Sequence, residues 1–212
     1  MSAAPKRPLV AILDYGIGNL RSAQKAFEKA GADARLTSDS SLVRDASAVV
    51  LPGVGAYGSC RRELARSGLD EDVRDAVDRS QPLLGICIGM QLLFDGSEES
   101  PGVEGLGLLR GSARFLPAGV PRPQMQWNEL KLIHPGDPLV AGLGADPWCY
   151  FVHSYALDGT AENVVASVEY GNEVAAIVRE GQVWATQFHP EKSGDVGQTI
   201  LRGFLSIASG TA

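Results

Sequence analysis

The residue most suited to chemistry is Cys87, the centre of a Gly-Ile-Cys-Ile-Gly segment at 85–89. A short apolar run precedes it, and Met90, Leu93 and Phe94 follow at helical spacing, which predicts a strand, a sharp turn and a helix. Such a turn holds a nucleophile in strained backbone, and the free N–H groups of the helix favour the reactive thiolate. Many buried cysteines are small apolar core residues, and this pattern alone leaves both interpretations open.

A cysteine that attacks an amide needs a base to take its proton and return it to the leaving amine. The chain has three histidines. We expect His134, in a turn, to face solvent and His153, within a strand, to be a hydrogen-bonded structural residue. His189 closes another strand, and a turn at Pro190 can bring the carboxylate of Glu191 to its far ring nitrogen, as in a catalytic triad. An edge histidine beside a surface glutamate is the alternative.

The elements that must position these residues begin with a β-α-β-α-β order, which predicts a mostly parallel sheet with helices on both sides. Asn19 is a plausible N-cap for the first helix, and Gly31 ends it. The predicted strands are 9–13, 32–37, 48–51 and the apolar run into Cys87, and the predicted helices are 20–30, 59–66 and 69–79.

The second half of the chain differs in composition and in hydrophobic pattern. Residues 98–123 are rich in glycine and proline and contain short strands at most, at 106–109 and 113–116. The next apolar segments predict a meander of antiparallel strands that extends the sheet, followed by an amphipathic helix at 196–208. The meander strands are predicted at 148–155, 164–170, 174–179 and 183–188.

Cys87 and His189 would meet at the carboxyl edge of the sheet, where open α/β folds place their sites. The Pro-Gly-Val-Gly loop at 52–55 ends a strand at the same edge. Its N–H groups, with the one after Cys87, could bind the oxyanion of a tetrahedral intermediate. Gly53 and Gly55 also have a simpler interpretation, because Pro-Gly pairs are common in turns.

Bulk composition bounds the class of protein. With 212 residues, of which 44% are hydrophobic, we expect a single domain at 1–212 with an ordered core at about 8–209. A net charge of −6 argues against a nucleic-acid surface. No apolar stretch is long enough for a membrane span, and no signal-peptide core is evident. We therefore expect a cytoplasmic protein without nucleic-acid or membrane partners.

Neither a cofactor nor a metal is expected. The cysteines Cys60, Cys87 and Cys149 are too widely spaced for a metal pair or a disulfide framework. The Gly-Ile-Gly at 16–18 resembles part of a dinucleotide fingerprint, but Arg21 occupies the place of the third glycine.

Residues 85–91 with the His-Pro-Glu at 189–191 resemble the class I (triad) glutamine amidotransferases. Further motifs resemble the family of glutaminase subunits of imidazole glycerol phosphate synthase, in histidine biosynthesis. The match covers nearly the whole chain. These motifs are Asp-Tyr-Gly and Gly-Asn-Leu within 14–20, Pro-Gly-Val-Gly at 52–55, Met-Gln-Leu-Leu-Phe at 90–94, Trp-Asn at 127–128, Phe-Val-His-Ser-Tyr at 151–155 and His-Pro-Glu-Lys-Ser at 189–193.

This resemblance implies that Cys87 attacks the side-chain amide of L-glutamine, releases ammonia and leaves a glutamyl thioester that water hydrolyses to glutamate. His189 would be the general acid and base, and Glu191 would orient it. The oxyanion and glutamine pocket would be lined by Gly53, Val54, Gly55 and Gln91, with Ser154 and Tyr155 holding the amino-acid end through main-chain contacts.

The resemblance also implies a heterodimer with a (β/α)₈ cyclase subunit. Ammonia would pass through the cyclase barrel and react with a phosphoribulosyl formimino carboxamide ribotide, giving imidazole glycerol phosphate and an aminoimidazole carboxamide ribotide. The resemblance implies a glutaminase that is nearly silent until the cyclase binds its ligand, and the flexible segment 53–55 beside Cys87 leads us to expect the same here. One motif departs from the family: Gln124 and Gln126 stand where Pro-His-Met-Gly-Trp-Asn has histidine and glycine, which bears on cyclase docking and activation.

Three alternatives remain at this point. The chain could serve another synthase, such as those for anthranilate, guanylate or aminodeoxychorismate. It could be a free-standing cysteine hydrolase of γ-glutamyl substrates, or a binding module with an inactive triad.

Overall fold

The computed structural model describes residues 7–211. Residues 1–6 and Ala212, which the predicted domain at 1–212 includes, lie outside the described residues, while the predicted core at about 8–209 falls within them.

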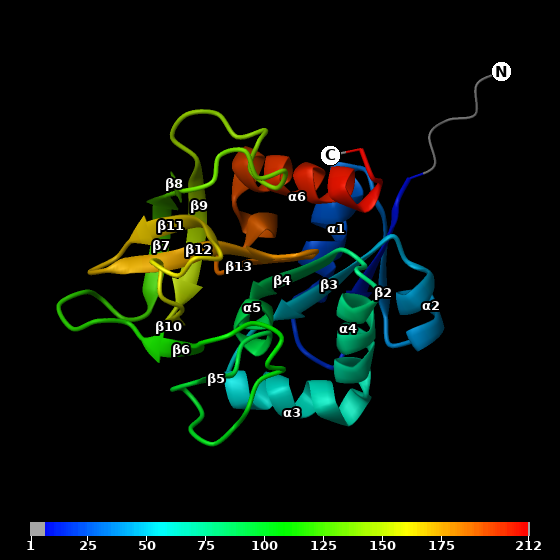
Figure 1. Cartoon of the computed structure of the whole chain (residues 1–212), viewed down its shortest axis with the longest axis horizontal. Helices are drawn as coiled ribbons and strands as arrows, with labels where there is room; N and C mark the ends of the chain where they lie inside the picture. Colours follow the sequence, from blue (N-terminus) through cyan, green and yellow to red (C-terminus); the bar gives the residue numbers. More distant parts are fainter. Residues whose placement is uncertain (1–6, 212) are drawn as a thin grey trace.

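Within residues 7–211, the main sheet has eight strands in the order β2-β1-β3-β4-β13-β12-β11-β8 (Figure 1). The strands from β2 to β13 run parallel to their neighbours, whereas β12, β11 and β8 continue the sheet in antiparallel fashion. The predicted α/β architecture is therefore confirmed. The strand bounds are β1 Leu9–Leu13, β2 Asp33–Thr37, β3 Ala48–Gly53, β4 Leu83–Cys87, β8 Lys131–Leu132, β11 Val164–Glu169, β12 Glu173–Glu180 and β13 Val183–Thr186.

Helices cover both faces of the parallel part, with α1 and α6 together on one side and α3 and α4 on the other (Figure 1). The rings of Phe27 in α1 and Phe204 in α6 pack edge to face with centroids 6.2 Å apart. These apolar faces close the core over strands whose side chains are almost all buried. The helices are α1 Leu20–Ala30, α2 Ser40–Asp45, α3 Tyr57–Ser67, α4 Leu69–Asp78, α5 Ile88–Leu92 and α6 Gly194–Ala208.

Helix α1 begins and ends where predicted, but only its C-terminal end is capped in the predicted way. Gly31 ends the helix in the left-handed conformation, with φ 115°, as predicted. Asn19 precedes the helix but makes no side-chain capping bond to it. Its Oδ1 instead accepts a hydrogen bond from the Ser22 hydroxyl at 2.8 Å.

The short helix α2 was not predicted. The Asp39 side chain caps it by accepting a hydrogen bond from the Ser41 N–H at 2.8 Å. Six residues, Ser40–Asp45, are too few for helical periodicity to be recognised in the sequence.

The predicted strand at 148–155 is wrong in its sheet and in its extent. The strand β9, Trp148–His153, leaves the main sheet and pairs antiparallel with β7, Gln124–Glu129. The sequence analysis missed β7 because most of its side chains are polar or exposed on both faces, so no apolar alternation marks it. The meander is confirmed only for β11, β12 and β13.

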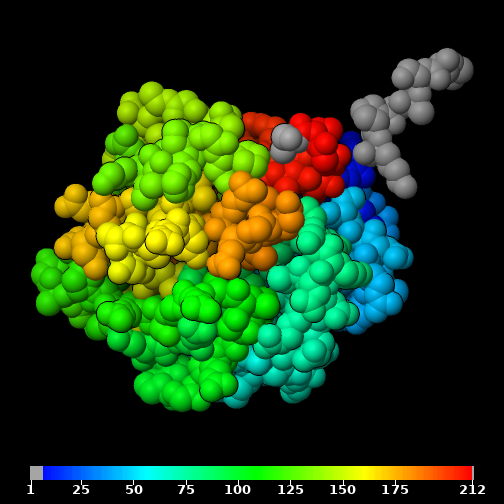
Figure 2. Space-filling view, viewed as in Figure 1, coloured from blue at the N-terminus to red at the C-terminus, as the bar shows by residue number. Residues whose placement is uncertain are grey.

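A third sheet joins three short strands that lie far apart in the sequence. It contains β5 Gly96–Ser97, β6 Ser112–Phe115 and β10 Tyr155–Ala156. The short strand predicted at 113–116 corresponds to β6, whereas residues 106–109 form no strand. Figure 2 shows that the N-terminal residues, in blue and cyan, occupy one side of this face of the molecule, and the green, yellow and orange residues occupy the other.

Candidate active site

The predicted turn at Cys87 is present. Cys87 ends β4 with φ 56° and ψ −112°, a conformation that non-glycine residues rarely adopt. A Cβ atom on Gly89 would lie 1.9 Å from the Leu51 carbonyl oxygen, and one on Gly53 would lie 2.3 Å from the Gly89 nitrogen. The ends of β3 and β4 and the start of α5 can therefore approach this closely only because both positions are glycine.

The predicted helix after the turn is α5, which spans only Ile88–Leu92. Its first N–H groups have no partner within the helix. The Ile88 N–H, next in the chain after Cys87, is the one that the sequence analysis assigned to the oxyanion.

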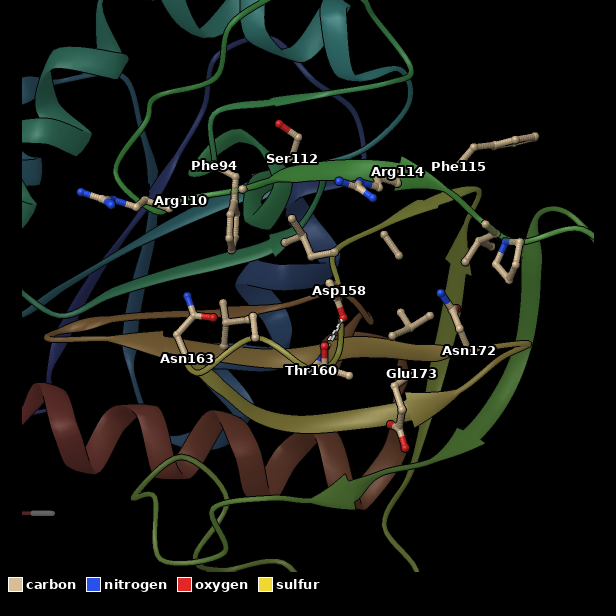
Figure 3. Close-up of a pocket in the computed structure, with 18 residues that line it drawn as sticks. Phe94, Arg110, Ser112, Arg114, Phe115, Asp158, Thr160, Asn163, Asn172 and Glu173 are labelled. Carbon is tan, nitrogen blue, oxygen red and sulfur yellow. Dashed lines mark hydrogen bonds between the residues drawn. The ribbon is translucent and has the colours of Figure 1, made fainter.

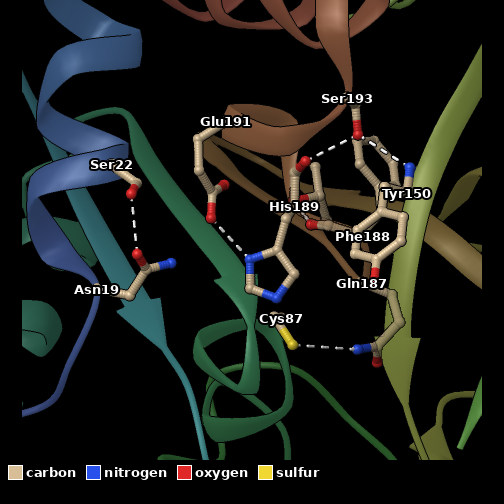
Figure 4. Close-up of polar contacts among 10 residues, drawn as sticks. Asn19, Ser22, Cys87, Tyr150, Gln187, Phe188, His189, Glu191 and Ser193 are labelled. Carbon is tan, nitrogen blue, oxygen red and sulfur yellow. Dashed lines mark hydrogen bonds and ion pairs between the residues drawn. The ribbon is translucent and has the colours of Figure 1, made fainter. Parts of the chain in front are cut away.

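His189 and Glu191 form the predicted pair. Two residues after the histidine, the 3₁₀ turn Pro190–Lys192 brings the Glu191 carboxylate to 2.8 Å from the His189 Nδ1. Both side chains are buried. In Figure 4 Cys87 lies next to the His189 ring, with Glu191 at the opposite edge of the ring.

The backbone of His189 is fixed by Ser193. The Ser193 hydroxyl donates to the His189 carbonyl at 2.7 Å and accepts from the Tyr150 N–H of β9 at 3.0 Å (Figure 4). These bonds connect the turn after β13 to the two-stranded sheet.

The electrostatic environment favours the charged form of His189. Burial lowers the pKa of the imidazole, but hydrogen bonds to Cys87 and Glu191 and the charges of those two groups outweigh it, raising the pKa to about 10. An imidazolium beside the sulfur stabilises a thiolate, so the arrangement can supply a nucleophile and a proton donor together.

A cavity of about 400 Å³ opens in front of Cys87 and His189. Charged side chains of Glu99 and Lys192, which the sequence analysis did not single out, also lie on its wall. The predicted pocket residues that line it are Val54, Gly55, Gln91, Ser154 and Tyr155.

Gly53 is the predicted pocket residue that is not on this wall. It pairs with Cys87 between β3 and β4, and its Cα packs against the start of α5. Glu191 lies behind the His189 ring and does not line the cavity either.

The sequence analysis missed Gln187. The Gln187 Nε2 donates to the Cys87 sulfur at 3.9 Å, and its Oε1 accepts from the Gln91 Nε2 at 3.1 Å. The Gln91 Nε2 also donates to the Tyr155 carbonyl at 2.9 Å. Alternation along an extended chain places residues 187 and 189 on the same face, which is the signal that could have identified Gln187.

His153 is buried and hydrogen bonded, as predicted, because its Nδ1 lies 3.0 Å from the Tyr155 carbonyl oxygen. Burial, assisted by the charge of His189, lowers the pKa of His153 to about 4 against the effect of that hydrogen bond. It is therefore neutral at pH 7. It also lines the cavity, which was not predicted, whereas His134 is exposed as expected.

The two glutamines that depart from the family motif share one partner on β7. Gln124 is buried and Gln126 is exposed. Their Nε2 atoms donate to the Asn128 Oδ1 at 2.9 Å and 2.7 Å respectively. Asn128 therefore links a buried and an exposed glutamine of the same strand.

A second cavity, of about 480 Å³, lies between β6 and the antiparallel part of the main sheet (Figure 3). Arg110, Arg114 and Asp158 are on its wall, and the Asp158 Oδ1 is bonded to the Thr160 N–H and hydroxyl at 2.9 and 2.7 Å. This cavity contains none of the predicted site residues.

The profile of the family described as glutamine amidotransferase class-I matches residues 11–207. The chain therefore belongs to that family of enzymes, and the fold agrees. A solved structure described as a crystal structure of glutamine amidotransferase superposes with a TM-score of 0.74 at 23% identity, covering 94% of this chain and 98% of that one.

Relatives with higher sequence identity share one name within this family. An imidazole glycerol phosphate synthase subunit HisH from Methanothermobacter thermautotrophicus is 45% identical over 199 residues, 94% of this chain and 98% of that protein. The subunit of the same name from Deinococcus radiodurans is 47% identical over 210 residues, 96% of this chain and 97% of that protein. Within residues 7–211, no helix combines the length and apolar character needed to span a bilayer.

Proposed function

We propose that this chain is the glutaminase subunit of an imidazole glycerol phosphate synthase and hydrolyses L-glutamine to glutamate and ammonia. One observation carries the proposal. The His189 Nδ1 lies 2.8 Å from a Glu191 carboxylate oxygen, and His189 and Cys87 line the same cavity. The high identity to subunits of that synthase supports the choice of this enzyme over other amidotransferases.

In the first half-reaction, the Cys87 thiolate attacks the carboxamide carbon of glutamine and forms a tetrahedral intermediate. The His189 imidazolium then gives its Nε2 proton to the leaving nitrogen, so that ammonia departs and a γ-glutamyl thioester remains. Glu191 holds the ring by its Nδ1 and stabilises its charge.

In the second half-reaction, His189 is neutral and takes a proton from water, which attacks the thioester carbonyl. Collapse of this second intermediate releases glutamate and regenerates the thiolate and the imidazolium. The oxyanion of both intermediates would be bound by N–H groups of the 52–55 loop and by the Ile88 N–H.

The cavity walls provide contacts for the rest of the substrate. Gln91 would contact the side-chain end, and the main chain of Ser154 and Tyr155 would hold the amino-acid end. Glu99 adds a carboxylate to the wall, which complements the α-ammonium group of glutamine.

A (β/α)₈ cyclase subunit is the proposed partner, in a cytoplasmic heterodimer, and would use the ammonia for ring formation. The supporting feature is a group of exposed apolar side chains on the β7–β9 sheet: Met125 is 60% exposed, and Trp127 and Trp148 are each 47% exposed. Val152 of β9 and Pro123, just before β7, line the cavity, so a partner on this sheet would lie beside the opening. Exposed apolar groups of this kind mark interaction surfaces.

The test is ammonia release from glutamine by the purified chain, alone and with a purified cyclase subunit and its nucleotide ligand. We expect weak release alone and strong release in the complex, with Cys87→Ala inactive in both. Strong release without the cyclase would contradict the activation, and copurification with a different synthase would contradict the choice of partner.

A further inference from the structure

Two buried side chains hold the loop at 52–55 from the side of the core. The first is Tyr15, which follows β1. Its hydroxyl donates a hydrogen bond to the Pro52 carbonyl at 2.5 Å, and the ring is buried. The start of the loop is thereby tied to the neighbouring strand.

The second is Cys60, in the first turn of α3. Its thiol donates to the Val54 carbonyl at 3.1 Å and is buried. Burial raises the pKa of the Cys60 thiol and of the Tyr15 phenol, so both groups keep their protons near neutral pH and act as donors.

These bonds restrain two peptide groups of the loop, those that carry the Pro52 and Val54 carbonyls. The Val54–Gly55 peptide bond is trans, so the Gly55 N–H points away from the carbonyl that Cys60 holds. Val54 and Gly55 line the cavity in front of Cys87, whereas Cys60 does not. The held orientation therefore places the carbonyl toward α3 and leaves the N–H on the opposite side of the peptide.

We propose that Tyr15 and Cys60 are positioning residues that hold the 52–55 loop by the Pro52 and Val54 carbonyls and so keep the loop N–H groups in place for the oxyanion of the reaction. The inference rests on the proposed glutaminase function. Neither side chain touches the substrate. They affect only the fraction of loop conformations in which an N–H group is in position to donate to the oxyanion of the tetrahedral intermediate.

The test is glutamine hydrolysis by Cys60→Ala and Tyr15→Phe in complex with the cyclase and its ligand. Each variant loses one hydrogen bond to the loop, so we expect kcat to fall about 3- to 10-fold. The KM for glutamine should change less than about twofold, because the oxyanion exists only after binding. Cys60→Ser keeps a donor of similar size and should recover most of the kcat.

Tyr57→Phe is the matched control. It removes another buried hydroxyl from the first turn of α3, but this hydroxyl has no hydrogen-bond partner among the described residues. We expect its kcat to equal that of the wild type. Alkylation of Cys87 by iodoacetamide, followed by peptide mass spectrometry, reports the nucleophile without needing an oxyanion donor and should have the same rate in all variants.

Unchanged kcat in both Cys60→Ala and Tyr15→Phe would overturn the inference. So would a slower alkylation that parallels kcat, or a Cys60→Ser variant as impaired as Cys60→Ala. A wild-type complex without glutaminase activity would instead refute the proposed function, so the two failures are distinguishable.

Discussion

Cys87 and His189 are held in place by different kinds of interaction. On the cysteine side, backbone packs directly on backbone: Gly89 lies against the Leu51 carbonyl, and Cys87 has a positive φ. On the histidine side, side-chain hydrogen bonds from Glu191 and Ser193 fix the ring and its main chain. The turn at Cys87 is therefore sensitive to added atoms, whereas the position of His189 is sensitive to lost polar groups.

The largest expected effect is the loss of kcat on replacing His189, which we compare with the loss on replacing Glu191. His189→Ala should lower kcat by about 10⁴-fold or more, because it removes the imidazole that lies beside the sulfur and transfers the proton in the proposed mechanism. Glu191→Gln should cost less, since the imidazole remains in reach of the sulfur. Steady-state kinetics of both variants in the complex measures the difference, and equal losses would argue against Glu191 as the third member of the triad.

The next effect tests the packing on the cysteine side. Gly89→Ala adds a methyl group that would lie 1.9 Å from the Leu51 carbonyl oxygen. We expect the free energy of unfolding to fall by about 3 kcal/mol. Gly144→Ala is the control, because a Cβ there meets nothing within 4 Å. Thermal unfolding of both variants measures the difference. A Gly89→Ala variant as stable as Gly144→Ala would show that close backbone packing does not determine the conformation of this turn.

The pH dependence of stability tests the polar side. The pKa of His189 is raised from its ordinary 6.5 to about 10 in the folded chain. Protonation therefore stabilises the fold fully below pH 6.5, and this contribution is lost as pH rises toward 10. The difference in unfolding free energy between wild type and His189→Ala should shrink over that range. A constant difference from pH 6 to 10 would contradict the raised pKa.

The smallest expected effect concerns Ser193. Ser193→Ala removes the bonds to the His189 carbonyl and the Tyr150 N–H, and should cost about 1–2 kcal/mol of stability and less than tenfold in kcat. Ser206→Ala also removes a serine hydroxyl bonded to a carbonyl, that of Arg202, but on the exposed surface of α6, and should change stability by less than about 0.5 kcal/mol. Similar losses of stability in both variants would contradict the role of Ser193 in fixing the backbone of His189.

The sequence by itself determined the parallel half of the fold and the reactive groups. Buried parallel strands are continuous apolar runs bounded by turn residues, so β1, β3 and β4 could be recognised locally. The turn at Cys87 and the pair His189–Glu191 each lie within a few residues, so local spacing indicated both geometries while leaving other interpretations open. The prediction that these groups meet used the rule that carboxyl ends of parallel strands share an edge, and the resemblance to class I glutamine amidotransferases implied their roles.

Only the tertiary structure decided the rest. The polar strand β7 has no apolar alternation, so its pairing with β9 depends on contacts between distant segments. The bonds from Gln187 to Cys87, and from Tyr15 and Cys60 to the 52–55 loop, follow from how neighbouring elements pack. Such contacts leave no periodic signal in the chain, because a hydrogen bond requires a direction and a distance that only the assembled backbone provides.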